Sequence, residues 1–283
     1  AFIFGKFGAP RMEIAGAALG TLLARTSEFL ATFGYILFKD KELGLRIKHL
    51  LHMPGEEFFS NYLRLGLPVL VSDGLLGLGG NIVSIILGHM GAAVVAANAI
   101  CQVIDRLFTV VIQGISNASS IVTGHTLGEG SREKAMQQGY TFYVLSIFFG
   151  LIAAVMVLAC GPLTIAMYTL NDETILMTEE MMGAYAVIVF FQCIQSVMTK
   201  GVLRGGGDTK FLMKADILFM WLVSIPLGGV GGLLLGWPAW LTILALRVDY
   251  VIKSVWCISR LKSGKWIHTA DGIAEEEPEK VTD

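Results

Sequence analysis

Charged residues are scarce in this sequence. Asp, Glu, Lys and Arg make up 16% of the 283 residues, and the net charge is −2. An average soluble domain has nearer 25% charged residues. Hydrophobic residues make up 54% of the chain, and the mean hydropathy is +0.66. These values argue against a soluble domain, and the lack of a basic excess gives no reason to expect a nucleic-acid partner.

Signals of enzymatic chemistry and of metal binding are also missing. The four cysteines lie in apolar segments, without the spacing of a metal site or a disulfide framework. No helix carries a His-Glu-x-x-His pair, and no nucleophile elbow is present. The glycine-rich run at residues 201–210 lacks the spacing of a phosphate-binding loop. The sequence therefore predicts a protein that is not an enzyme, with no metal site and no organic cofactor.

Long apolar runs are abundant instead. Seven segments reach the length of a membrane span, namely residues 14–38, 65–88, 92–124, 140–168, 177–203, 211–235 and 238–259. Lys and Arg gather in every second connection and after the last span, which is the distribution that the positive-inside rule predicts. We expect an all-α, polytopic membrane helix bundle in the cell (inner) membrane, with a cytoplasmic C-terminus.

The first and last spans resemble each other. Four identical residues and one acidic residue recur at an offset of 221 positions. This favours a six-helix repeat that begins at Leu65 and follows the last helix of an earlier repeat. The predicted domains are the last helix of a truncated N-terminal lobe (1–38), a cytoplasmic linker (39–64), a C-terminal six-helix lobe (65–263) and a disordered cytoplasmic tail (264–283). The predicted partner of this lobe is the missing N-terminal lobe.

The third span carries an unbroken stripe of polar residues. Its members are Asn98, Gln102, Asp105, Thr109, Gln113, Ser116, Asn117 and Ser120. Steps of mostly three and four residues place them on one helical face. The stripe is about 33 Å long at about 1.5 Å per residue, roughly the thickness of the hydrocarbon core. Such a face is costly against lipid, which favours a wet cavity. Hydrogen-bonded packing between helices is the alternative.

Two shorter polar stripes suggest that the cavity is shared by several spans. One follows Asp73 along the second span, and the other follows Gln192 along the fifth. Asp73 has no basic residue within four positions, so its carboxylate is a candidate to bind a proton or a cation. The candidate substrate- or ion-binding residues are Asp73, Asn81, Asn98, Gln102, Asp105, Asn117, Gln192 and Gln195.

Other charged residues within the apolar segments are expected to form pairs. Arg25 and Glu28 are three positions apart, and Asp249 and Lys253 are four apart, so each set can pair on one helical face. Asp216 lies near the end of its span, where we expect it to be hydrated.

Four segments resemble the multidrug and toxic compound extrusion (MATE) family. They are GAPRMEIAGAALGT from Gly8, GHMGAAVVAANAI from Gly88, NASSIVTGHTLGEG from Asn117 and GVLRGGGDTKF from Gly201. The resemblance covers roughly residues 8–262. It implies two six-helix lobes that export amphipathic or cationic compounds in exchange for H⁺ or Na⁺. Cys193 stands where some members have an aspartate, and Asp73 precedes the acidic position of some members, so the coupling ion stays open.

The function that we expect is secondary active multidrug efflux by alternating access, with the lipid bilayer and small amphipathic substrates as partners. One alternative is a lipid-linked oligosaccharide flippase of the same superfamily. It requires more basic charge in the central cavity than Arg25 and Arg106 supply. Another alternative is a seven-helix receptor or retinal protein, for which Lys253 in the last span is the relevant residue.

Overall fold

The computed structural model describes residues 12–38, 56–168 and 170–267, and these residues form helices and short connections without a strand. This confirms the all-α prediction. The chain divides into two units, Ala1–Asn61 and Tyr62–Asp283. The predicted linker and tail fall mostly on residues 39–55 and 268–283, which lie outside the described residues. Residues 56–64 of the predicted linker form the beginning of α3 (Glu56–His89).

The first unit contains α1 (Glu13–Phe38). Arg25 Nη1 lies 2.8 Å from Glu28 Oε2, and both side chains are exposed. The predicted pair is therefore confirmed. Its exposure also means that Arg25 contributes no buried charge within its own unit.

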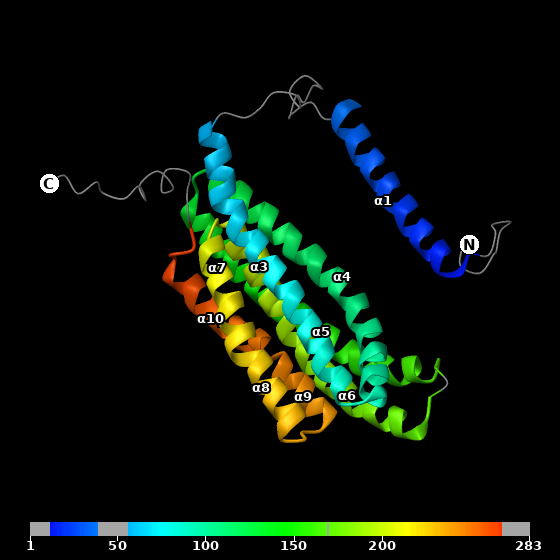
Figure 1. Ribbon diagram of the computed structural model, residues 1–283. Helices are drawn as coiled ribbons and strands as arrows, with labels where there is room; N and C mark the ends of the chain where they lie inside the picture. The colour runs from blue at the N-terminus through cyan, green and yellow to red at the C-terminus, as the bar shows by residue number, and fades with distance from the viewer. Residues whose placement is uncertain (1–11, 39–55, 169, 268–283) are drawn as a thin grey trace. The chain divides into compact units, whose positions relative to one another are not determined.

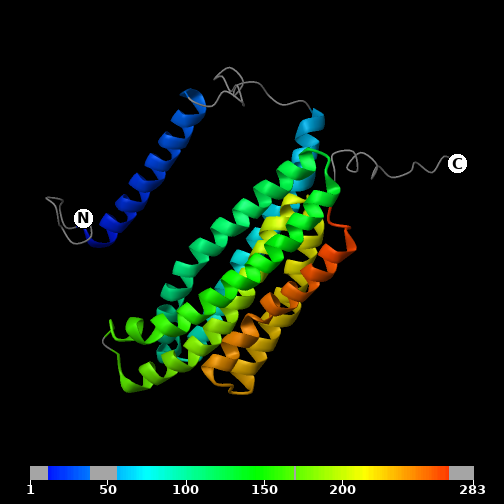
Figure 2. The same ribbon diagram turned by 180° about the vertical axis from the view of Figure 1, so that it is seen from behind.

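The helices of the second unit run alternately in opposite directions, side by side (Figures 1 and 2). They are α3 (Glu56–His89), α4 (Ala92–Gly128), α5 (Arg132–Ile165), α6 (Asp172–Ser196) with the π-helical η1 (Val197–Leu203), then α7 (Thr209–Asp216), η2 (Ile217–Ser224), α8 (Ile225–Gly229) and η3 (Val230–Leu234), and finally α9 (Ala239–Leu246) and α10 (Val248–Ser263). The central core lies between α4, α5, α6 and α9, and includes Ile104, Met181, Val189 and Ile243.

The connections gather at two ends of this unit, and glycines with positive φ form several of the turns. We call one end the Arg204 end, because the turn at residues 204–208 lies there beside the α4–α5 connection (Figure 1). We call the other the Gly91 end, because the α3–α4 connection lies there together with the η3–α9 turn. The polar stripe of α4 runs from the Gly91 end towards the Arg204 end.

Five helices formed by described residues are long and apolar enough to cross a membrane. They comprise Gly66–His89, Ala92–Gly128, Arg132–Ile165, Asp172–Leu203 and Thr209–Leu234. The last predicted span is interrupted at Arg247, whose φ of −119° and ψ of 12° separate α9, with 8 residues, from α10, with 16. Neither piece alone reaches the roughly 20 residues of a span. The interruption was not predicted from the hydropathy pattern.

Glycines bring η1 and the turn after it into backbone contact with α4. A Cβ atom built on Gly205 would lie 2.7 Å from the Ser120 carbonyl oxygen, and one on Gly201 would lie 3.0 Å from that of Ser116. Ser116 Oγ also donates a hydrogen bond of 2.9 Å to the Ser196 carbonyl oxygen. Small residues at such positions let membrane helices approach closely, and here they fix η1 against the polar stripe.

Substitution of Gly205 by alanine is expected to lower the free energy of unfolding by about 1–3 kcal/mol, because the added methyl group overpacks a backbone contact. Thermal unfolding of the purified protein in detergent measures this loss. Gly183→Ala on α6 is the matched control, since its Cβ would meet no atom within 4 Å. Equal unfolding temperatures for the two variants would contradict the close approach of the turn to α4.

Candidate functional site

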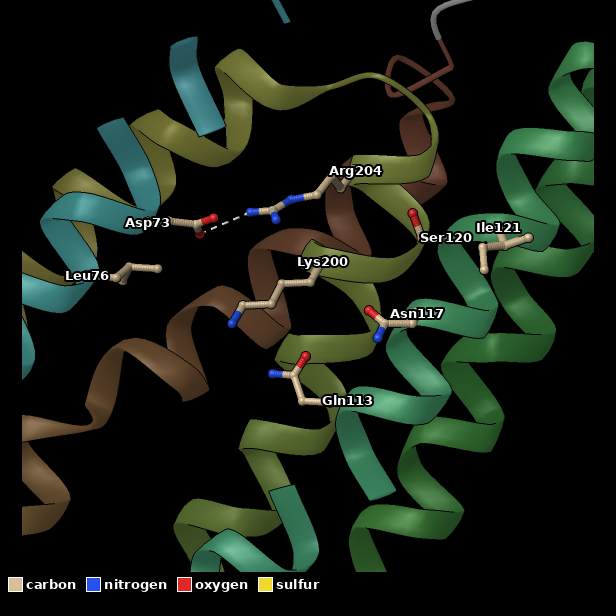
Figure 3. Close-up of a pocket in the computed structure, with 8 residues that line it drawn as sticks. All are labelled: Asp73, Leu76, Gln113, Asn117, Ser120, Ile121, Lys200 and Arg204. Carbon is tan, nitrogen blue, oxygen red and sulfur yellow. Dashed lines mark hydrogen bonds and ion pairs between the residues drawn. The ribbon is translucent and has the colours of Figure 1, made fainter. Parts of the chain in front are cut away.

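The polar stripe of α4 lines two cavities. The larger, the Arg204-end cavity, has a volume of about 660 Å³ and is lined by Asp73, Leu76, Gln113, Asn117, Ser120, Ile121, Lys200 and Arg204 (Figure 3). The smaller, the Gly91-end cavity, has a volume of about 230 Å³ and is lined by Gly80, Val83, Ser84, Asn98, Gln102, Asp105, Arg106, Tyr185, Ile188, Gln192, Ile243, Arg247 and Tyr250. The stripe therefore supplies polar groups to both.

The stripe helix also packs against α6 and η1. Gln192 Nε2 donates a hydrogen bond of 3.2 Å to Thr109 Oγ1, and buried Ser116 bonds to the Ser196 carbonyl oxygen. Both alternatives considered for the stripe thus apply, each to a different part of it. Hydrogen bonds hold Thr109 and Ser116 against α6, and the stripe residues on the two sides of Thr109 line the two cavities.

In the Arg204-end cavity an ion pair joins α3 to the end of η1. Arg204 Nη2 lies 3.2 Å from Asp73 Oδ1 (Figure 3). The expectation that Asp73 lacks a basic partner is therefore wrong. Residue spacing along one helix reveals partners only within about one helical turn, and Arg204 is 131 residues away from Asp73 in the sequence.

Lys200 and Arg204 are functional candidates that the sequence analysis missed. Lys200 lies on the π-helical segment η1, and Arg204 is the first residue after the end of η1. Both side chains extend into the cavity (Figure 3). π-Helical turns are rare and often occur at functional sites. From the sequence the two residues counted among the basic residues that set the orientation of the spans. Their separation of four positions was the available signal that they share a face.

The Gly91-end cavity joins polar groups of α4 and α6. Tyr185 Oη donates a hydrogen bond of 2.7 Å to Asn98 Oδ1, which holds the Asn98 amide in place. Gln102 lines the same cavity. Asp105 Oδ1 is buried and has no hydrogen-bond partner among the described residues. A carboxylate oxygen in that position is available to a ligand, a proton or a cation.

Arg247, at the break between α9 and α10, also lines this cavity. Arg247 Nη1 donates a hydrogen bond of 3.1 Å to Tyr250 Oη, and its guanidinium lies 5.6 Å from the centre of the Tyr250 ring. Arg247 and Arg106 line the cavity together with Asp105. Each cavity therefore has two basic side chains and one acidic side chain. Of the two arginines expected to supply basic charge, Arg106 lines this cavity, and Arg25 pairs with Glu28 on α1 in the other unit.

Six of the eight predicted site residues line these two cavities. Asp73 and Asn117 lie in the Arg204-end cavity, and the Gly91-end cavity contains the other four, namely Asn98, Gln102, Asp105 and Gln192. Asn81 is exposed on α3 and lines neither cavity. Gln195 is buried, and its Nε2 donates a hydrogen bond of 3.0 Å to Thr199 Oγ1 within the same helix. Asn81 and Gln195 therefore line neither of these two cavities.

A buried ionic cluster lies apart from both cavities. Lys253 Nζ is 2.8 Å from Asp216 Oδ1 and 3.1 Å from Asp249 Oδ2. Ser72 Oγ donates a hydrogen bond to Asp216, and Ser224 Oγ donates one of 3.3 Å to Asp249. The predicted Asp249–Lys253 pair is confirmed. The prediction of a hydrated Asp216 was wrong, because Lys253 reaches it from another helix. We call this set the Lys253 cluster.

Comparison with known proteins identifies the family. The MatE family model matches residues 68–230. The chain is 28% identical over 232 residues to a multidrug resistance protein MdtK of Photorhabdus laumondii, with 82% of this chain and 50% of that protein covered. It is 28% identical over 274 residues to a probable multidrug resistance protein NorM of Thermotoga maritima, with 94% of this chain and 56% of that protein covered. The chain thus spans about half the length of the curated relatives that it matches.

Solved structures of transporters share the fold. The crystal structure of MATE in complex with MaL6 superposes with a TM-score of 0.75 at 18% identity, covering 93% of this chain and 59% of that one. A MOP superfamily transporter from Pyrococcus furiosus superposes with a TM-score of 0.73 at 20% identity, with the same coverage of 93% and 59%. On the family match and the polytopic helical fold together, this chain belongs to the MATE family of multi-pass membrane transporters, which are not enzymes.

Proposed function

We propose that the intact protein is a secondary active exporter of amphipathic or cationic small molecules, driven by exchange for H⁺ or Na⁺ through alternating access. The observation that supports this most is the polar face of α4, which lines cavities at two levels of one bundle. A transport route needs polar groups at successive depths of the membrane, and a protein that only anchors or signals does not. The relatives described as multidrug resistance proteins agree with this proposal.

We further propose the domain organisation that the sequence predicted. Residues 65–263 are the C-terminal six-helix lobe, and residues 1–38 contribute the last helix of the other lobe. Residues 39–64 are the cytoplasmic linker, and residues 264–283 the cytoplasmic tail. In this arrangement α1 and the interrupted α9–α10 are spans as well, which gives seven. Coverage of about half of each relative supports a second lobe that completes the substrate cavity.

The proposed location is the cell (inner) membrane, with the Arg204 end and the C-terminus in the cytoplasm. Basic residues gather at the Arg204 end, including Arg132, Lys134, Lys210 and Lys262, whereas the connections at residues 90–91 and 235–238 contain no Lys or Arg. This asymmetry follows the positive-inside rule. The Arg204-end cavity then faces the cytoplasm.

Within this scheme Asp105 is the proposed ion-responsive group, and the amides of Asn98, Gln102 and Gln192 contact the substrate. Asp105 has an unpartnered buried carboxylate oxygen in the Gly91-end cavity. Asp73 and Asn117 lie in the Arg204-end cavity, where substrate enters. Binding of H⁺ or Na⁺ at a carboxylate shifts the equilibrium between the two lobe arrangements only if the ion binds one of them more tightly.

Efflux measured in vesicles that contain the intact protein tests this function. A fluorescent amphipathic cation should leave the cytoplasmic compartment when either a proton or a sodium gradient is imposed, and its flux should stop when the gradient collapses. Absence of gradient-driven flux under both ions would refute the proposed function.

A lipid-linked oligosaccharide flippase stays as the second candidate for one reason. A flippase of this kind requires more basic charge in the central cavity than Arg25 and Arg106 provide, and Lys200, Arg204 and Arg247 add basic charge to the two cavities. Membership in a transporter family removes the seven-helix receptor as a candidate.

A further inference from the structure

The Arg204-end cavity contains more positive than negative charge. Its one acidic side chain, Asp73, is already paired with Arg204 at 3.2 Å. Lys200 lines the same cavity and has no ion pair or hydrogen bond to any residue that the structure describes. A lysine ammonium within a membrane span needs a compensating anion or water. The unpaired charge in this cavity is therefore positive.

The neutral groups around Lys200 add hydrogen-bond donors. Gln113 and Asn117 of α4 point into the cavity towards Lys200 (Figure 3), and Ser120 lies one turn further along the same face. Arg204 Nε is buried and has no hydrogen-bond acceptor among the described residues. Guanidinium, ammonium, amide and hydroxyl groups that line one cavity match the several acceptor oxygens of a phosphate or carboxylate.

The positions of Lys200 and Arg204 disfavour a cationic ligand in the Arg204-end cavity. A cation would meet the Lys200 ammonium and would have to compete with Arg204 for the only carboxylate in the cavity. Leu76 and Ile121 complete the lining, so an apolar group attached to the anion has a surface to contact. The volume of about 660 Å³ is in the range of small-molecule sites, which is about 300–1,000 Å³.

We propose that the Arg204-end cavity binds the phosphate or carboxylate group of an amphipathic anion through Lys200 and Arg204, with Gln113 and Asn117 as further donors. The proposal rests on the proposed function in that it names a substrate class for the same transport route. It differs from the sequence-based expectation, which placed a cation beside Asp73.

Calorimetric titration of the intact protein in detergent tests this inference with three probes. The probes are inorganic phosphate, a short-chain phosphatidic acid and tetraphenylphosphonium. Phosphatidic acid is expected to bind, and Lys200→Met should weaken its affinity at least about tenfold, the equivalent of about 1.4 kcal/mol. Lys214→Met, which removes an exposed lysine of α7, is the matched control and should leave that affinity unchanged. Comparable binding of inorganic phosphate would indicate a free phosphate as the source, and binding of the lipid alone would indicate a lipid headgroup.

Arg204→Met serves as a second variant, with the same expected loss of phosphatidic acid affinity. Lys200→Met is the less disruptive of the two, because the Lys200 side chain has no partner among the described residues that its removal would leave unpaired. Phosphatidic acid affinity that is unchanged in both variants would overturn the inference, as would tight tetraphenylphosphonium binding that is lost in Asp73→Asn.

The vesicle assay distinguishes failure of this inference from failure of the proposed function. Cation export without anion binding would overturn this inference alone, and anion binding without any export would refute the proposed function alone.

Discussion

Replacement of Lys253 by methionine is expected to lower the free energy of unfolding by about 3–5 kcal/mol, because removal of one member of a buried ion pair leaves an uncompensated charge. Lys253 is 1% exposed and lies between Asp216 and Asp249. Without it, two carboxylates face each other in the interior, and the serine hydroxyls alone cannot compensate both. Chemical or thermal unfolding of the purified protein in detergent measures the loss.

Two variants separate this ionic effect from a general loss of packing. Lys262→Met removes an exposed lysine from the same helix and should change stability by no more than about 0.5 kcal/mol. Asp216→Asn keeps the Lys253–Asp249 pair and should destabilise less than Lys253→Met. If Lys253→Met were as stable as Lys262→Met, the Lys253 cluster would not contribute to the stability of the bundle.

Asp105→Asn is expected to reduce gradient-driven efflux by the intact protein at least about tenfold, the equivalent of about 1.4 kcal/mol. The amide keeps the shape of the side chain but can neither take up a proton nor attract a cation strongly. Asp105 Oδ1 has no hydrogen-bond partner among the described residues, so this substitution breaks no bond at that oxygen. Efflux from vesicles under proton and sodium gradients, with the amount of folded protein measured in parallel, gives the result.

Asp172→Asn is the control for this variant. Asp172 is an exposed carboxylate in the first turn of α6, it lines neither described cavity, and its loss should leave efflux unchanged. Wild-type efflux in Asp105→Asn would remove Asp105 from the coupling scheme. The coupling group would then be sought in the proposed second lobe or in the Lys253 cluster.

Local spacing predicted the parts of the site that a single helix determines. The steps between Asn98, Gln102 and Asp105 identified a shared face of α4, and the structure opens that face onto a cavity. The four-residue step from Asp249 to Lys253 likewise predicted their contact. Both results depend only on the period of the α-helix, which the sequence displays directly.

Contacts between distant segments could not be predicted in this way. Asp73 meets Arg204 across 131 positions, and Lys253 meets Asp216 from another helix. Helical periodicity contains no information on which helices are neighbours. The same limit explains why the basic lining of the Arg204-end cavity was overlooked.

The break at Arg247 escaped prediction for a different reason. The predicted span at residues 238–259 has charged residues at Arg247 and Asp249 but no glycine or proline at the break, so no breaker residue marks it. A non-helical backbone at membrane depth is tolerated where it lines a cavity. The Arg247 side chain lines the Gly91-end cavity, which is consistent with that condition.

Labelling of single cysteines along α4 tests whether its polar face borders water-filled space in a transport route. In a variant of the intact protein with the four native cysteines replaced by alanine, a membrane-impermeant thiol reagent should modify Gln113→Cys and Asn117→Cys, whose native side chains line the Arg204-end cavity. It should not modify Leu107→Cys or Val110→Cys, which point away from the bundle and are expected to face lipid. Modification of the first two positions alone is the predicted result. Unreactive cysteines at both Gln113 and Asn117, with the protein folded and the reagent present on both sides of the membrane, would contradict the account.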